Sequence, residues 1–191
     1  MTAWLFPTGV TTHVLLAAAL RNPTIRLRYL SARHVLMEYG CKDLYPDLLR
    51  LLGCDHMSSQ RIEQHLTKLE CTFDAAAKAA QTPLFFSTDI TPEARRIAIG
   101  GSRELIRTGC HREAVFWIAA TFARCHKILE TDAPPGLQES LIPAFHAILA
   151  DLGIPSPDHI NRRVEEVRQF LPVLWQTTEA ILKANPDIKR S

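Results

Sequence analysis

Apolar residues recur three and four positions apart along most of the chain, which is the period of an amphipathic helix. Strict alternation of apolar and polar residues, the period of a half-buried strand, is not found after residue 10. The clearest helical stripe consists of Ile62, Leu66, Leu69, Phe73 and Ala76. The pattern predicts an all-α protein and leaves residues 1–10 open between a short strand and a loop.

Helix-start and helix-stop residues organise residues 1–82 as an N-terminal helical segment. Thr11 or Thr12 is expected to cap a first helix, which ends before Pro23 because the residue ahead of a proline avoids the helical region. Further helices are expected over residues 24–39, over residues 43–52, and from Ser58 or Ser59 onward. Polar residues and a proline at 83–90 then interrupt the pattern, so we place a boundary there.

Residues 91–185 are predicted to form four long helices with short connections. The first begins at Thr91-Pro92-Glu93, which combines an N-cap hydroxyl, a proline in the first turn and a carboxylate at the positive end of the helix dipole. Gly109 separates it from a second helix that runs to about Leu129. The last helix begins near Ser156, and Pro172 is expected to kink or divide it. Four such helices are typical of an up-and-down bundle.

Each of the last three predicted helices carries an apolar stripe. In the order of the chain, these stripes are Val115, Ala119, Phe122, His126 and Leu129; then Leu141, Phe145, Ile148 and Leu152; then Ile160, Val164, Val167, Leu171, Leu174 and Ile181. A lone histidine in such a stripe, as at position 126, is usually a core residue rather than a catalyst.

Composition and charge indicate a soluble globular protein. The chain has 191 residues, 47% of them hydrophobic, and a formal net charge of +2, which is too small to favour nucleic-acid binding. Its longest apolar run, Val14 to Leu20, is too short to cross a bilayer. Five cysteines and no recognisable secretion signal favour reduced thiols and a cytoplasmic location, without membrane association.

Three neighbouring cysteine and histidine pairs raise the question of a metal site. They are Cys54 with His56, Cys110 with His111, and Cys125 with His126. Zinc requires four ligands around one point, whereas fifteen residues of one helix would hold Cys110 and Cys125 roughly 22 Å apart. We therefore expect neither a metal nor another cofactor.

Two catalytic patterns are incomplete in this chain. Gly100-Gly101-Ser102 is similar to the turn that precedes the metal-binding acids of nucleotidyltransferases, but the second acid of that motif is missing after Glu113. An arginine followed by a histidine, the pattern of some ribonucleases, occurs as Arg28 with His34 and Arg50 with His56. Two such pairs are what chance supplies in a chain with this many arginines and histidines. We assign no catalytic residue.

Two groups of residues in the central helical hairpin are candidates for ligand binding. At the turn, Arg107, His111 and Arg112 are placed to hold an anionic group, and a solvated, salt-bridged turn is the simpler alternative. On another face of the second helix, Glu113, Trp117 and Arg124 recur at helical spacing and are candidates to line a groove.

The hairpin also carries a family resemblance. The run Ser102 to Ile106, then Gly109, then Glu113 to Trp117 and Lys127 to Leu129 resembles the first helix pair of HEPN-type domains. These are similar to the C-terminal, substrate-binding helical domain of kanamycin-type nucleotidyltransferases. The resemblance covers about residues 91–185. It implies a helical module that contributes a binding groove and dimerises, while another polypeptide supplies the catalytic acids.

The leading functional hypothesis is therefore a non-catalytic binding or interaction module. Its expected partners are a second copy of the chain or a nucleotidyltransferase-like protein, and its expected ligand is a nucleotide or another anion. An RNA-cleaving toxin that uses His34 or His56 as acid or base is one alternative. An unrelated helical regulator or scaffold is another.

Overall fold

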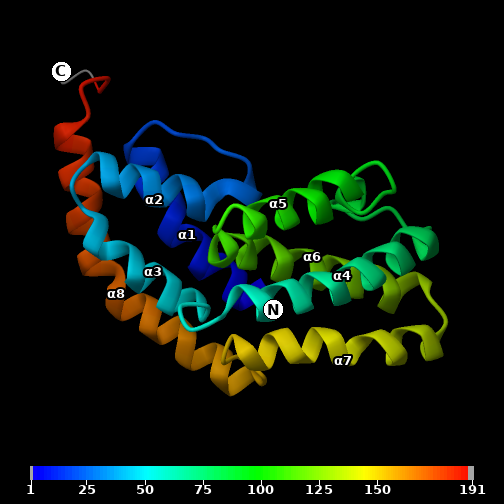
Figure 1. Ribbon diagram of the computed structural model, residues 1–191. Coiled ribbons are helices and arrows are strands. Elements are labelled where there is room, and N and C mark those ends of the chain that lie inside the picture. The colour runs from blue at the N-terminus through cyan, green and yellow to red at the C-terminus, as the bar shows by residue number, and fades with distance from the viewer. Residues whose placement is uncertain (1, 189–191) are drawn as a thin grey trace. The chain divides into compact units, whose positions relative to one another are not determined.

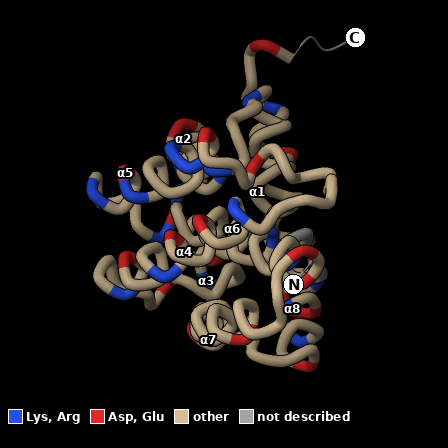
Figure 2. The backbone as a smooth tube through the Cα atoms, turned by 90° about the vertical axis from the view of Figure 1, so that its right-hand side faces the viewer, with Lys and Arg blue, Asp and Glu red and all other residues tan. Residues whose placement is uncertain are grey.

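The computed structural model describes residues 2–188, which form eight α-helices and no strand (Figure 1). The all-α prediction is therefore confirmed. The described residues divide into two compact units: residues 2–55 together with 156–188, and residues 56–155. Positions of Lys and Arg are interspersed with positions of Asp and Glu along the backbone (Figure 2), in keeping with the small net charge.

The first unit is built around a long helix at each end of the chain. It contains α1 (Thr2–Ala18), α2 (Arg28–Glu38), α3 (Tyr45–Leu52) and α8 (Pro157–Ala184), with short 3-10 turns before α2 and α3. The main packing partners in this unit are α1 with α8 and α1 with α2. Two polar contacts tie α1 to its neighbours: the Tyr29 hydroxyl donates to the Thr8 carbonyl at 3.0 Å, and Asn185 Nδ2 donates to the Ala18 carbonyl at 3.0 Å.

Helix α1 corrects the expectation for the start of the chain. Residues 2–10 are neither strand nor loop but helix, with Pro7 inside it. Thr11 and Thr12 are not N-caps; they are buried and donate to the carbonyls of Thr8 and Gly9 at 2.8 and 2.9 Å. A threonine hydroxyl can donate a hydrogen bond to a carbonyl in the preceding turn of its own helix. A buried threonine in a helix therefore keeps a hydrogen-bond partner.

The second unit contains α4 (Ser59–Ala79), α5 (Gly101–Arg107), α6 (His111–Asp132) and α7 (Pro135–Asp151). In it α6 packs on α4, α5 and α7, and its central residues from Ala114 to Phe122 are all buried. Every residue of the predicted α4 stripe is buried, and so is every residue of the predicted α6 stripe. The caps expected for this unit are present: Ser58 accepts from the Arg61 amide at 3.2 Å, and Thr91 from the Ala94 amide at 3.2 Å.

The helices are grouped differently from the expected bundle of residues 91–185. Helix α4 packs with α6 and α7 in one unit, whereas α8 packs on α1 in the other. The compact units thus do not follow the expected division into residues 1–82 and 91–185. An apolar stripe shows that a helix has a buried face, but it does not identify the helix that covers it.

Three details of the predicted helices also differ. The helix expected to start at Thr91 has an irregular π-helical stretch at Arg96–Gly100 before α5. Helix α8 continues through Pro172 without division. Its buried residues include Phe170, whereas Leu171 is 44% exposed.

Candidate functional site

The turn between α5 and α6 holds the first group of sequence candidates. Gly109 has φ +82°, a left-handed conformation that favours glycine, and the following Cys110 amide closes the turn on the Leu105 carbonyl at 2.8 Å. Arg107 donates to Glu104 at 2.7 and 3.0 Å. Both side chains are well exposed, so this pair contributes little stability. Arg107 is thus held by a local salt bridge, while His111 and Arg112 begin α6.

Two residues of the second group, Trp117 and Arg124, belong to a packed cluster. The Arg124 guanidinium lies 4.9 Å from the centre of the Trp117 ring, and its Nη1 donates to Asp89 at 2.8 Å. Phe86 covers the same guanidinium at 5.9 Å. Trp117 and Glu113 are both buried, with 7% and 4% of their surface exposed. The structure therefore brings Trp117 and Arg124 together as a packed cation-π pair rather than as the wall of an open groove.

The six candidates do not converge on one point. Arg112 and Arg124 are twelve residues apart on α6, which corresponds to about 18 Å along the helix. The partners of Arg124, Phe86 and Asp89, lie in the segment 83–90 that the sequence identified only as a break between helices. The polar clusters of residues 83–90 gave no signal of this contact, because it depends on tertiary packing.

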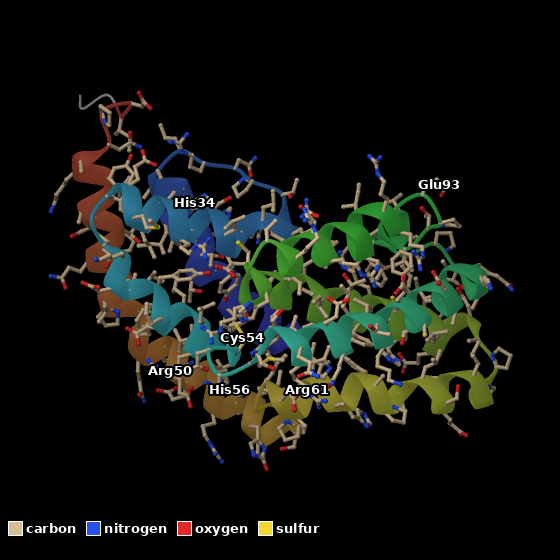
Figure 3. All side chains as sticks on the ribbon, viewed as in Figure 1. His34, Arg50, Cys54, His56, Arg61 and Glu93 are labelled. Atoms are coloured by element: carbon tan, nitrogen blue, oxygen red, sulfur yellow. The ribbon has the colours of Figure 1, made fainter. Side chains whose placement is uncertain are left out.

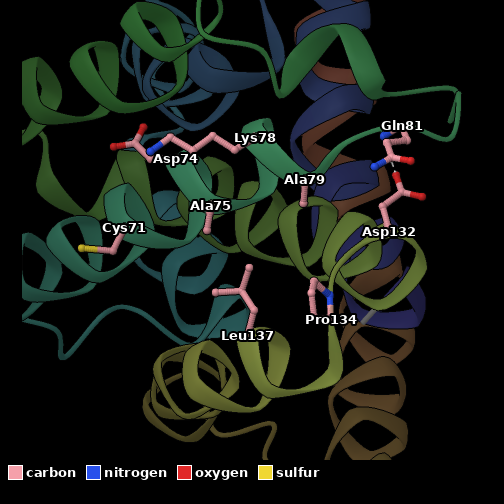
Figure 4. Close-up of a pocket in the computed structure, with 9 residues that line it drawn as sticks. All are labelled: Cys71, Asp74, Ala75, Lys78, Ala79, Gln81, Asp132, Pro134 and Leu137. Carbon is pink, nitrogen blue, oxygen red and sulfur yellow. Dashed lines mark hydrogen bonds between the residues drawn. The ribbon is translucent and has the colours of Figure 1, made fainter.

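An open groove lies elsewhere in the second unit, between the C-terminal half of α4 and the start of α7 (Figure 4). Its volume is about 530 Å³. The residues that line it are Cys71, Asp74, Ala75, Lys78, Ala79, Gln81, Asp132, Pro134 and Leu137. Leu137 points from α7 toward Ala75 on α4, so that small and apolar side chains form the floor.

Both carboxylates of the groove are already occupied by donors. Asp132 accepts from the amides of Gln81 and Thr82 at 2.8 and 2.9 Å and from the Thr82 hydroxyl at 2.6 Å. These bonds, led by that from the Gln81 amide, lower the pKa of Asp132 below its ordinary value. Asp74 accepts from Arg95 Nε at 2.8 Å. Lys78 is exposed, and no ion pair to it is found within residues 2–188.

An ion-pair network borders the groove on α4. Arg95 bridges Asp74 and Glu70, and Arg103 bridges Glu70 and Glu63, with the closest contact of each arginine to Glu70 at 2.5 and 2.8 Å. The hydrogen bond from Arg103 is the main reason that the pKa of Glu70 is lowered. The network ties the segment before α5 to α4, and it accounts for both arginines by intramolecular contacts.

Two buried histidines of this unit differ in their surroundings. His65 on α4 lies 2.7 Å from Asp151 on α7, and burial lowers its pKa although the carboxylate opposes the shift. His126 is stacked 4.9 Å from Phe145, and neither of its ring nitrogens has a hydrogen-bond partner within the described residues. Burial, with a smaller contribution from His146, lowers the pKa of His126 to about 4. The expectation that His126 belongs to the core is confirmed.

The arginine and histidine pairs considered for RNA cleavage belong to or follow helices α2 and α3. Arg28 and His34 both belong to α2, where a separation of six residues places them about 120° apart around the helix axis. Arg50 on α3 donates to Asp47 at 2.9 Å, whereas His56 lies beyond the end of that helix (Figure 3). The cleavage hypothesis stays a prediction.

The Gly-Gly-Ser turn proves to be part of a helix. Gly100 ends the π-helical stretch and is exposed; a Cβ atom there would meet only Arg96 Cγ, at 3.9 Å. Close packing therefore does not explain Gly100. Ser102 is fully buried and donates to the Ala98 carbonyl at 2.7 Å. The hydroxyl of Ser102 is thus hydrogen-bonded within its own helix.

The cysteines of two neighbouring cysteine and histidine pairs occupy different turns of α6. Cys110 precedes its first residue, whereas Cys125 lies within the helix, and burial raises the pKa of the Cys125 thiol. Within residues 2–188, no three side chains of His, Cys, Asp or Glu come together as metal ligands would. Among the described helices, none is both long and apolar enough to cross a bilayer.

Comparison with known proteins adds no further constraint. The chain matches no family model, no curated protein sequence and no solved structure.

Proposed function

We propose that this protein is a non-catalytic helical binding module whose ligand is an anion with an apolar part, held in the groove between α4 and α7. This is the role that the resemblance to the substrate-binding domains and accessory subunits of nucleotidyltransferases implies. The observation that carries the proposal is the position of Lys78 beside the apolar floor of a groove of about 530 Å³. Volumes of this order are typical of small-molecule sites.

The charges of the groove favour an anionic ligand. Asp74 is held by Arg95, and Asp132 accepts three hydrogen bonds from Gln81 and Thr82. Neither carboxylate needs a cation from a ligand. The ammonium group of Lys78 is then the charge that a ligand can neutralise, and a phosphate or carboxylate is its natural partner.

The floor of the groove favours a flat or apolar group next to that anion. Ala75 and Ala79 leave room above α4, while Pro134 and Leu137 form the opposite wall. Covering these side chains removes apolar surface from water, which stabilises a complex by about 25 cal/mol for each Å² buried. A nucleoside monophosphate combines both features and is a suitable probe of the class.

The proposal is tested by titrating the ¹⁵N-labelled protein with AMP and, separately, with adenosine, while amide shifts are followed by NMR. AMP is expected to shift amides of residues 71–81 and 132–137, and adenosine to bind at least tenfold more weakly. Lys78→Glu should abolish the AMP shifts. Lys68→Glu, which reverses another exposed lysine of α4 outside the groove, should leave them unchanged.

Two results would contradict this function. One is the absence of any shift at millimolar AMP. The other is an equal response of the wild-type protein and the Lys78→Glu variant, because binding would then lie outside the groove. Both variants should keep the thermal unfolding midpoint of the wild-type protein, since each replaces an exposed side chain.

A further inference from the structure

The outer face of α8 carries partly exposed apolar side chains, one of which, Trp175, donates from Nε1 to Glu179 on the same helix at 3.1 Å. Leu171, Trp175 and Leu182 are 44%, 61% and 37% exposed. Their spacings of four and seven residues place them within about 40° of one another around the helix axis. They form one stripe, distinct from the buried face of α8 that includes Val167, Phe170 and Leu174.

Charged residues flank this stripe on one side and at both ends. Glu165 and Arg168 lie toward the start of α8, and Glu179 and Lys183 lie toward its end. At present they are joined along the helix: Arg168 to Glu165 at 3.1 Å, and Lys183 to Glu179 at 4.0 Å. All four side chains are roughly half to three-quarters exposed, so these pairs contribute little stability and can exchange partners.

The order of the charges makes the stripe complementary to itself in one orientation. The midpoint of Glu165 and Lys183 is residue 174, and that of Arg168 and Glu179 falls between residues 173 and 174. The midpoint of Leu171 and Trp175 is residue 173. A twofold axis near this point brings Glu165 against Lys183, Arg168 against Glu179 and Leu171 against Trp175 of a second copy.

We infer that α8 is a docking surface for a second copy of this chain, which packs on it antiparallel about a twofold axis near residue 174. In a twofold antiparallel pair of helices, each flank of one helix meets the same flank of the other. The pairs Glu165 with Lys183 and Arg168 with Glu179 therefore each form twice, which gives four contacts between opposite charges. The apolar stripe supplies the centre, where Trp175 is the largest side chain, and tryptophan is enriched at the energetic centres of interfaces.

A parallel arrangement does not have this property. In a parallel twofold pair each flank of one helix meets the opposite flank of the other. The four charged residues share one flank of α8, so they would not meet one another across that interface. The charge pattern therefore selects the antiparallel pair.

The three tryptophans provide a specific readout. Trp4 and Trp117 are buried, whereas Trp175 is exposed, so its indole is the one that loses water on association. Tryptophan emission is expected to shift to shorter wavelength as protein concentration rises from about 0.1 to 100 µM. Sedimentation velocity over the same range should show conversion of monomer to dimer. Leu171→Lys should leave a monomer, and Met37→Lys, at another exposed apolar residue, on α2, should not.

A charge swap tests the orientation. Arg168→Glu should weaken the dimer at least tenfold because it places two carboxylates together, and adding Glu179→Arg should restore most of the lost affinity. Circular dichroism melts verify that each variant is folded.

A chain that stays monomeric at 100 µM overturns the proposal, as does a dimer that survives Leu171→Lys. A swap that fails to restore binding overturns the antiparallel pairing. AMP binding in the groove is independent of all these outcomes.

Discussion

Nε2 of His65 on α4 lies 2.7 Å from Oδ2 of Asp151 at the end of α7, and the same oxygen accepts a hydrogen bond from Arg61 Nε at 2.5 Å. The imidazole is almost completely buried, whereas the guanidinium is about half exposed. Because burial keeps His65 neutral, its Nε2 carries the proton and donates it to the carboxylate. One acid thus joins the two helices at a single oxygen.

Replacing Asp151 is expected to destabilise the second unit. Asp151→Ala leaves the buried Nε2–H of His65 without an acceptor, which costs about 2 kcal/mol in free energy of unfolding. Urea unfolding followed by circular dichroism at pH 7 measures this loss. Glu130→Ala, which breaks an exposed pair with Lys127, is the matched control and should cost less than about 0.5 kcal/mol. Equal losses of stability in the two variants would show that the hydrogen bond between His65 and Asp151 contributes no more than an exposed ion pair.

The same carboxylate makes part of the stability depend on pH. Burial alone would raise the pKa of Asp151, but the hydrogen bonds from Arg61 and His65 lower it below its ordinary value. A group whose pKa is lower in the folded state contributes stability above its unfolded pKa and loses it as the pH falls through the folded value. The difference in stability between wild type and Asp151→Ala should therefore narrow below about pH 4.

His126 is expected to destabilise the fold in mild acid. Its pKa is about 4 in the folded state against 6.5 for the free side chain, so the unfolded chain takes up a proton first as the pH falls. At pH 5 this amounts to a loss on the order of 2 kcal/mol relative to pH 7. His126→Leu should remove that part of the pH dependence, because leucine does not titrate.

Urea unfolding at pH 7 and pH 5 measures the effect of His126. An exposed histidine serves as the control: His34→Gln on α2 should leave the wild-type difference between the two pH values unchanged. If His126→Leu loses as much stability as the wild-type protein between pH 7 and pH 5, proton uptake at this ring does not drive the effect.

Arg124 is expected to stabilise the second unit through Trp117 and Asp89. Arg124→Gln removes both the cation above the ring and the ion pair, so it should cost about 1–2 kcal/mol and change the emission of Trp117. Urea unfolding with fluorescence detection measures both effects. Arg107→Gln, at an exposed pair, should change neither by a measurable amount. A larger loss for Arg107→Gln would reverse the roles assigned to the two arginines.

Asp132 is expected to hold the segment that follows α4. Its three hydrogen bonds to Gln81 and Thr82 are the contacts that fix residues 81–82 to the end of α6. Asp132→Ala should speed proteolysis and amide exchange within residues 80–90, and Asp132→Asn, which keeps one acceptor oxygen, should have an intermediate effect. Unchanged exchange in the alanine variant would mean that other contacts hold this segment.

Local patterns in the sequence were sufficient to predict the buried faces of α4 and α6 in the second unit. The stripe from Ile62 to Ala76 is buried, as its helical period predicts. The hydroxyls of Ser58 and Thr91 each accept a hydrogen bond from the backbone amide three residues later. The start of the chain was not predictable in this way. Pro7 lies within α1, and the stability of that helix comes from its packing on α2 and α8 rather than from the propensity of its residues.

The candidate site shows the same limit more strongly. Trp117 and Arg124 could be paired from their spacing on one helix, but Asp89, which completes that cluster, comes from a segment thirty-five residues earlier. The groove near Lys78 combines residues from α4, from the end of α6 and from the start of α7. Each of these residues is unremarkable along the chain, and the site exists only through tertiary structure.

The division of the chain into units affects how it can be synthesised and folded. The second unit, residues 56–155, is continuous, so all of its helices are available once that stretch has left the ribosome. In the first unit, α1 packs on α8, whose first residue is Pro157. Helix α1 is therefore made well before α8, the helix with which it makes its main packing contact. We expect residues 56–155 to be expressible alone, whereas residues 1–55 alone would expose the apolar face of α1 and aggregate.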